Sequence, residues 1–272
     1  MHFPARRAVA AITCVVSLAF SLPAAATGLT VGGTGMGLGL MAKLGEAFAA
    51  SPDGVEVKVL PSLGSSGGIR ALNAGAIDLA VSARPLKDKE KGKGSRAIAL
   101  ARTPFVLVTS HQHPGGIRRE ALAAMFMQDA PVWPDDTPVR VVLRQENDSD
   151  NAVLANFFPG MAEALARART RPFIPVARND QENLSIAMRM EGSLTAASLM
   201  QVLAEEADVR LIDIDGVAPT VDNLSERTYS FFKTLYVVFP AQPRAETNAL
   251  LRYARSVEAR RILWEAGAAL VD

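Results

Sequence analysis

Cysteine is almost absent from this sequence. The 272 residues contain one, Cys14, and it lies in an uncharged, mainly apolar segment over residues 8–22. If that segment is removed, the remaining chain has no disulfide and no thiol chemistry. Cys14 also falls too early in the apolar segment to match the Leu-x-x-Cys spacing of a lipoprotein.

Histidine is equally scarce, and beyond the first residues only His111 and His113 remain. Two histidines at the end of a strand could share a metal ion, but no third His or Cys completes a usual site. Neither has an identifiable partner for a Ser-His-Asp or Cys-His arrangement. We therefore predict no catalytic residue, no metal and no cofactor, and an exported hydrolase is the least favoured function.

The chain also has no large excess of positive or negative charge. The chain carries 29 Lys and Arg against 28 Asp and Glu, a formal net charge of +1 that becomes −1 without Arg6 and Arg7. This near-neutral balance argues against bulk nucleic-acid binding. After residue 22 no run is long and apolar enough to cross a membrane.

Residues 1–26 have the features of a secretory signal peptide. Arg6 and Arg7 precede the apolar segment, and the small residues 23–26 suit cleavage near Ala26. A membrane anchor is the alternative, but the segment falls short of the roughly 20 residues that a spanning helix needs. We predict a soluble exported protein, most simply a periplasmic one.

A glycine- and serine-rich stretch, residues 64–68 (Gly-Ser-Ser-Gly-Gly), lies between a strand-like run at 55–60 and a helix-like run at 69–74. A glycine-rich turn that opens a helix exposes backbone N–H groups and the positive end of the helix dipole. The stretch therefore suits an anion. The alternative is a strand-to-helix turn with serine caps and no ligand.

A second glycine-rich loop, residues 32–37, follows a strand candidate at 29–31. It precedes a helical pattern in which Leu40, Leu44 and Phe48 share one face. Its glycines are out of register for a dinucleotide fingerprint, and no acidic ribose partner is evident about 20 residues on. Backbone donors at the start of a helix are the plainer interpretation.

An arginine marks the other main place suited to an anion. A predicted strand at 140–143 leads into Arg144, and a helical pattern follows from Ala152, with Ser149 or Asp150 as N-cap candidate. The planar guanidinium matches an oxyanion and makes strong charge-assisted hydrogen bonds. The alternative is that the arginine merely pairs with the acidic residues that follow it, namely Glu146, Asp148 and Asp150.

Strand-like and helical segments alternate along the rest of the chain. Strands are predicted at 75–82, 98–110, 174–176, 209–214 and 235–239, and helices at 118–127, 161–168, 180–190, 194–206 and 245–266. Such alternation predicts an α/β fold with largely parallel sheets. In such folds ligands bind at the carboxyl ends of strands.

Taken together, the sequence resembles the phosphate-binding proteins of bacterial ABC importers, within the periplasmic solute-binding superfamily. The resemblance rests on residues 64–70 (GSSGGIR) and 75–86 (GAIDLAVSARPL), with further support from 122–126, Trp133 and 138–144. It spans most of the chain after the signal peptide and is strong only in the first half.

The resemblance implies an α/β, two-lobed periplasmic-binding-protein fold, type II-like, with the ligand cleft between the lobes. Lobe 1 would comprise residues 27–105 and 236–272, and lobe 2 residues 106–235. The implied function is capture of an inorganic oxyanion, most simply phosphate, for an ABC transporter permease. The protein would be a periplasmic monomer, would bind no nucleic acid and would not be an enzyme.

The resemblance also implies the ligand-binding residues. These are Thr34, Gly35, Met36, Ser65 and Ser66 from lobe 1, and Arg144, Ser149, Asp150 and Asn151 from lobe 2.

Two departures from the family pattern leave the identity of the oxyanion open. Where the family has an aspartate that accepts the hydrogen of protonated phosphate, this chain has Ala83, with Arg84 beside it. Losing a carboxylate there removes an evident filter against fully ionised dianions such as sulfate. The loop over 144–151 is also longer than the family's and lacks its Gly-Thr. Phosphate, sulfate, molybdate and an organic phosphonate all stay possible.

These departures motivate an alternative from another class. The protein would keep the two-lobed fold as a sensor or interaction protein, with a degenerate anion pocket. Titration with anions distinguishes the two functions, because a sensor without a pocket shows no anion effect.

Overall fold

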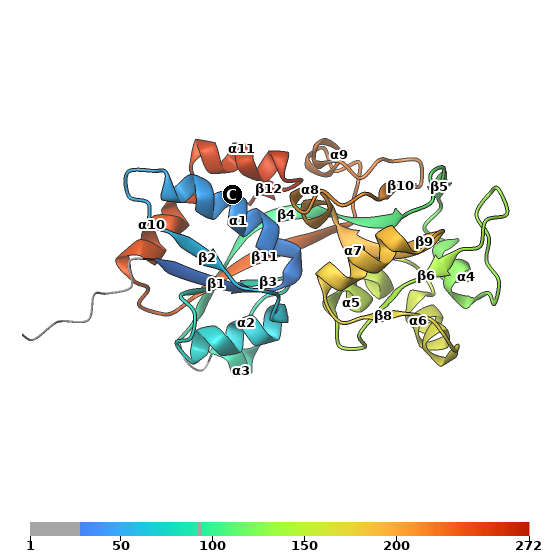
Figure 1. The fold of residues 1–272 in the computed structure, drawn as a ribbon, viewed down its shortest axis with the longest axis horizontal. Helices are drawn as coiled ribbons and strands as arrows, with labels where there is room; N and C mark the ends of the chain where they lie inside the picture. The colour runs from blue at the N-terminus through green and yellow to red at the C-terminus, as the bar shows by residue number, and fades with distance from the viewer. Residues whose placement is uncertain (1–27, 92–93, 272) are drawn as a thin grey trace, which may run out of the picture.

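The computed structural model describes residues 28–91 and 94–271, and it consists of two α/β lobes side by side (Figure 1). The predicted signal peptide lies outside the described residues. Within the described ranges, no helix has the length and apolar character needed to span a membrane.

The first lobe is built from both ends of the described chain. Its elements are β1 (Leu29–Gly33), the 3-10 helix η1 (Gly35–Gly37), α1 (Leu38–Ala49), β2 (Val57–Val59), α2 (Gly64–Asn73), β3 (Leu79–Ser82), α3 (Asp88–Lys91), α10 (Ala245–Tyr253), α11 (Val257–Glu265) and β12 (Ala269–Leu270).

The second lobe is built from the middle of the chain. Its elements are β5 (Gly116–Ile117), α4 (Leu122–Met127), β6 (Arg140–Val141), β7 (Leu143–Arg144), α5 (Ser149–Phe157), α6 (Met161–Thr170), β8 (Val176–Ala177), α7 (Asp180–Arg189), β9 (Ser193–Ser198), α8 (Leu199–Ala204), β10 (Arg210–Ile214) and α9 (Val221–Ser225).

Two long strands, β4 (Arg96–Thr109) and β11 (Phe232–Phe239), connect the lobes. The first part of β4, up to Pro104, pairs antiparallel with β11, and β11 in turn pairs with β3 of the first lobe. From Phe105 onward β4 pairs instead with β9 and β10 of the second lobe. One strand therefore belongs to both lobes, and the chain returns beside it.

The alternation of strands and helices predicted largely parallel sheets, but the sheets are mixed. The crossover between the lobes explains the difference. Parallel pairing joins β1 to β2 and β3, β5 to β10, β6 to β9, and β7 to β8. The described pairs that involve β4 or β11 are all antiparallel. The prediction was wrong here because helical crossovers impose parallel pairing only within a lobe.

Each lobe has its own large hydrophobic core. The first-lobe core includes Leu40, Leu44 and Phe48, the three residues predicted to share one face of a helix. The second-lobe core is centred on residues such as Phe126 and Phe158. Two separate cores joined by two strands form an arrangement suited to hinge motion between the lobes.

Two predicted helices are wrong in part. The segment 194–206 is strand β9 followed by helix α8, which begins where the Ser198 side chain accepts a hydrogen bond from Gln201 N. All six residues of β9 are buried, so the strand shows no period-2 alternation. The segment 245–266 is two helices, because Ser256 caps a new one by accepting from Ala259 N.

The glycine- and serine-rich stretch 64–68 is not a turn before a helix but the start of helix α2 itself. Gly64 has φ +66°, a left-handed conformation that favours glycine. Gly68 is required for a different reason, since a Cβ built on it would lie 2.6 Å from the Cα of Gly33. The stretch therefore lets α2 approach the end of β1.

A Gly68→Ala variant is accordingly expected to lower the free energy of unfolding by roughly 1–3 kcal/mol, because the added methyl overpacks a backbone contact. This loss would occur despite the better helix propensity of alanine. Gly67→Ala is the matched control, since its Cβ would meet only Leu63 Cβ, at 3.2 Å. Urea unfolding of both variants tests this, and equal stability would contradict the packing argument.

Candidate functional site

Arg144 lies at the end of β7, which is held beside β8 by parallel pairing. Only 4% of the residue is exposed. Its Nη2 pairs with the carboxylates of Asp148 and Asp180, the latter at 3.2 Å. Its Nε and Nη1 are buried and donate to no acceptor among the residues that the structure describes. A buried guanidinium with two unused donors is costly unless a ligand or water accepts from them.

The loop after Arg144 is closed by Asp148 and Asn151. Asp148, rather than Ser149 or Asp150 as predicted, is the N-cap of α5, and its Oδ1 accepts from Asp150 N at 2.9 Å. The Asn151 side chain donates to the carbonyl of Gln145 at 2.6 Å. These bonds fix Asp148 against the guanidinium of Arg144. The sequence left open that Arg144 pairs with the acidic residues that follow it, and one of its three nitrogens, Nη2, does so.

Asp150 forms an ion pair with Lys233 of β11, and the side chains of both residues are 2% exposed. Burial raises the pKa of Asp150, partly offset by the charge of Lys233. Burial would lower the pKa of Lys233, but the charges of Asp150, Asp180 and Asp148, with the hydrogen bond to Asp150, together outweigh it and raise the pKa. The pair ties the start of α5 to a strand that connects the lobes.

Asp180 lies in the candidate site, and the sequence interpretation missed it. It is the first residue of α7 and is 7% exposed. Its Oδ2 accepts from the backbone N–H of Met36 in the first lobe at 3.1 Å, while its Oδ1 faces Arg144. Met36 and Arg144 were predicted to lie on opposite sides of one ligand, and the structure joins them through this carboxylate.

The first-lobe wall carries the two serines. Ser65 Oγ accepts from Ala83 N at 3.0 Å, and Ser66 Oγ accepts from Arg84 Nη2 at 2.9 Å. Arg84 also pairs in bidentate fashion with Glu90, and this contact lowers the pKa of Glu90 to about 2. Thr34 is buried, with its N–H bonded to the carbonyl of Val81 in β3.

Carboxylates outnumber cations around Arg144. The cluster contains Arg144 and Lys233 against Asp148, Asp150 and Asp180. Burial would lower the pKa of Arg144, but the three carboxylates outweigh it and raise the pKa, so the guanidinium stays charged. With all five groups ionised the cluster has a formal charge of −1.

The structure places one of the two histidines against an aromatic ring. His111 stacks on Trp133 with ring centroids 5.3 Å apart, and its Nε2 lies 3.5 Å from Asp135 Oδ2. Across residues 28–91 and 94–271, no group of three or more His, Cys, Asp or Glu residues could hold a metal ion.

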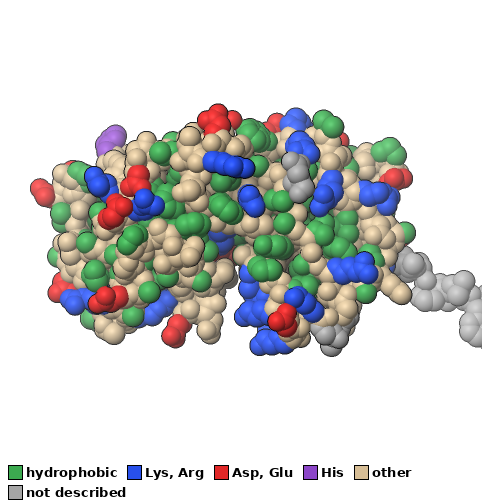
Figure 2. All heavy atoms as spheres, turned by 180° about the vertical axis from the view of Figure 1, so that it is seen from behind, with side chains coloured by type: hydrophobic (Ala, Val, Ile, Leu, Met, Phe, Trp, Pro, Cys, Tyr) green, Lys and Arg blue, Asp and Glu red, His purple; other side chains and the backbone are tan. Residues whose placement is uncertain are grey.

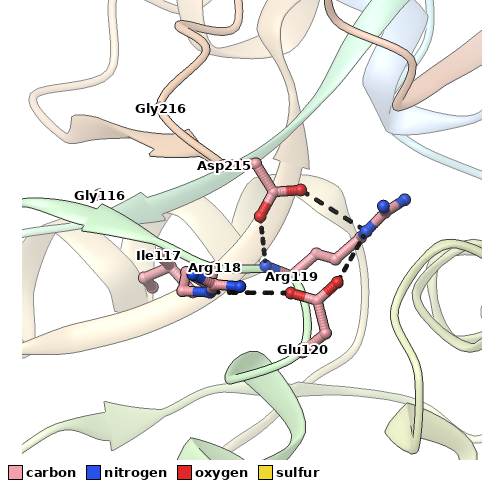
Figure 3. Close-up of a pocket in the computed structure, with 7 residues that line it drawn as sticks. All are labelled: Gly116, Ile117, Arg118, Arg119, Glu120, Asp215 and Gly216. Atoms are coloured by element: carbon pink, nitrogen blue, oxygen red, sulfur yellow. Dashed lines mark hydrogen bonds and ion pairs between the residues drawn. The ribbon is translucent and has the colours of Figure 1, made fainter.

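A surface pocket of about 470 Å³ lies elsewhere, beside β5 and β10 (Figure 3). None of the predicted ligand-binding residues lines it. Arg119 there contacts Asp215 and Glu120, and Arg118 lies 4.0 Å from Glu120. These arginines are exposed and pair with carboxylates, whereas the buried Arg144 keeps two donors without an acceptor among the described residues.

Comparison with known proteins identifies the family. A family profile described as "PBP superfamily domain" matches residues 21–258, and the chain therefore belongs to this superfamily. A comparison with curated protein sequences found no match.

Several solved structures share the fold. A protein from Clostridium perfringens solved with bound phosphate has a TM-score of 0.74 at 18% identity, covering 90% of this chain and 100% of its own. The molybdate-binding protein of Azotobacter vinelandii has 0.60 at 16%, with coverages of 90% and 100%. Reduced OxyR from N. meningitidis has 0.59 at 10%, with the same coverages.

Proposed function

We propose that this protein is a periplasmic solute-binding protein that captures an inorganic oxyanion, most simply phosphate, and delivers it to an ABC importer. The observation that carries the proposal is Arg144, which is buried between the lobes with Nε and Nη1 directed at no protein acceptor. An oxyanion offers several acceptor oxygens to such donors and neutralises the guanidinium.

The surroundings of the cleft support an anion. Figure 2 shows a notch between the lobes, with Lys and Arg side chains gathered on the first-lobe side, where α2 and α3 lie. Lys87, Lys89 and Lys91 are exposed there. A basic rim attracts anions toward the more deeply buried arginine. The protein from Clostridium perfringens solved with phosphate, and the molybdate-binding protein, give the fold a precedent for oxyanions.

The proposed ligand contacts keep the nine predicted residues but divide their roles. Direct contacts come from Arg144, the side chain of Thr34, the backbone at Gly35 and Met36, and Ser66 and Ser149. Positioning falls to Ser65, which accepts from Ala83 N, to Asp150, which pairs with Lys233, and to Asn151, which closes the loop. The proposed lobe boundaries, 27–105 with 236–272 and 106–235, differ from the composition of the two cores at three residues: Phe105 packs in the second-lobe core, and Met200 and Leu235 pack in the first-lobe core.

The test is calorimetric titration of the exported protein after unfolding and refolding have removed bound anion. We expect saturable one-site binding of phosphate. Sulfate and molybdate are titrated in parallel. If the protein prefers either of these fully ionised dianions to phosphate, the missing carboxylate at Ala83 explains that preference. Binding of none of the three would contradict the proposal and favour an interaction protein.

A further inference from the structure

Helix α7 lies at the edge of the second lobe that faces the first (Figure 1), and its N-terminus touches η1. The Asp180 carboxylate spans this contact, with Oδ2 3.1 Å from Met36 N and Oδ1 3.2 Å from Arg144 Nη2. A single carboxylate thus engages one donor from each lobe. Both donors belong to the set proposed to bind the oxyanion.

The residue after Asp180 strengthens the same contact. Gln181 Nε2 donates to the carbonyl of Gly35 at 3.1 Å and to Glu205 Oε1 at 2.7 Å. A Cβ built on Gly35 would lie 2.4 Å from Gln181 Oε1 and 2.6 Å from Asp180 Oδ2. The two lobes therefore meet here without room for even a methyl group, and only glycine at position 35 permits the contact.

We propose that Asp180 is a tethered internal anion that latches the lobes together and competes with the external oxyanion for the Met36 N–H and for the positive charge of Arg144. The inference rests on the proposed function. A carboxylate and an oxyanion accept the same hydrogen bonds, and two negative charges at hydrogen-bond distance repel strongly in a buried site. Because Asp180 is attached to the protein, its effective concentration at the site is high. Asp180 thereby sets the affinity for the ligand.

The affinity test compares Asp180→Asn with Glu182→Gln by phosphate titration. Both variants remove one negative charge from the first turn of α7, but the Glu182 carboxylate forms its ion pair and hydrogen bonds with Arg178 of its own lobe. We expect Asp180→Asn to bind phosphate at least about tenfold more tightly, since a nearby like charge is removed. We expect Glu182→Gln to bind as the unmodified protein does.

Unchanged or weaker phosphate binding by Asp180→Asn would overturn the proposal. Weaker binding, with phosphate no longer preferred over sulfate, would mean that Asp180 assists the ligand by accepting its proton.

The contact that Asp180 makes between the lobes can also be tested without any ligand. Small-angle X-ray scattering of anion-stripped protein should give a larger radius of gyration for Asp180→Ala than for the unmodified protein. Gly35→Ala should act likewise, because it wedges the contact open and leaves every charge in place. Equal radii for all three proteins would overturn the latch. If no protein binds an anion, the proposed function fails, and the scattering result still decides whether the latch exists.

Discussion

An Arg144→Ala variant is expected to lose phosphate binding, with the dissociation constant raised at least about a hundredfold. Each hydrogen bond to a charged group contributes about 1.5–3 kcal/mol, and two guanidinium nitrogens have no protein acceptor. Losing two such bonds corresponds to about 3 kcal/mol or more, and every 1.4 kcal/mol is tenfold in affinity. Isothermal titration calorimetry measures the change directly.

Two further variants show whether Arg144 contributes to phosphate affinity through its charge or through the geometry of its guanidinium. Arg144→Lys keeps the charge but not the planar fork, so its affinity should fall between those of the unmodified protein and the alanine variant. Arg140→Ala is the matched control, because Arg140 lies on the neighbouring strand β6, is exposed, and pairs with Glu191 at the surface. Circular dichroism establishes that each variant folds. Unchanged phosphate binding by a folded Arg144→Ala protein would remove the arginine from the site.

The surroundings of Arg144 show what local sequence could predict about this part of the chain. Its place at the end of a short strand follows from the apolar residues before it, and the acidic loop after it indicated the ion pair with Asp148. Sequence spacing could not decide between ligand and ion pair. Among the described residues, Nη2 is paired with carboxylates while Nε and Nη1 have no acceptor, which is the observation that the proposed ligand contact rests on.

Asp180 could not have been found in the same way. Its contact with Met36 joins residues 144 positions apart and depends on how the lobes meet. Locally the residue is only an acidic first-turn position behind the Asn179 cap, a common feature of exposed helices. The one related signal in the sequence is the absence of a carboxylate at Ala83, where the family pattern supplies one.

The same limit applies to the fold. Helix α1 was predictable because its three large apolar residues repeat at helical spacing and all enter the first-lobe core. Strand β9 was not, because its small residues are buried on both faces and its apolar run merges with that of α8. Periodicity identifies an element with one buried face and carries little information about one that is wholly enclosed.

A Lys233→Met variant is expected to lose about 3–5 kcal/mol of unfolding free energy, because it leaves Asp150 buried without its cation. Lys233 and Asp150 are both almost fully enclosed, and burial already raises the pKa of Asp150. Lys43→Met, an exposed lysine of α1, is the control and should change stability little. Urea unfolding at neutral pH measures both.

Two further measurements, a pH series and a double variant, test whether the loss of stability comes from the ion pair. A carboxyl with a raised pKa stabilises the fold more as the pH falls, since the native state then binds more protons than the unfolded state. The deficit of Lys233→Met should therefore shrink on acidification, as Asp150 becomes protonated. The double variant Asp150→Ala with Lys233→Met should be far less destabilised than the sum of the two single variants, because neither charge is left unpaired. Additive losses would instead show that Lys233 contributes mainly by packing along β11, and the pair would not be what fixes the start of α5 beside Arg144.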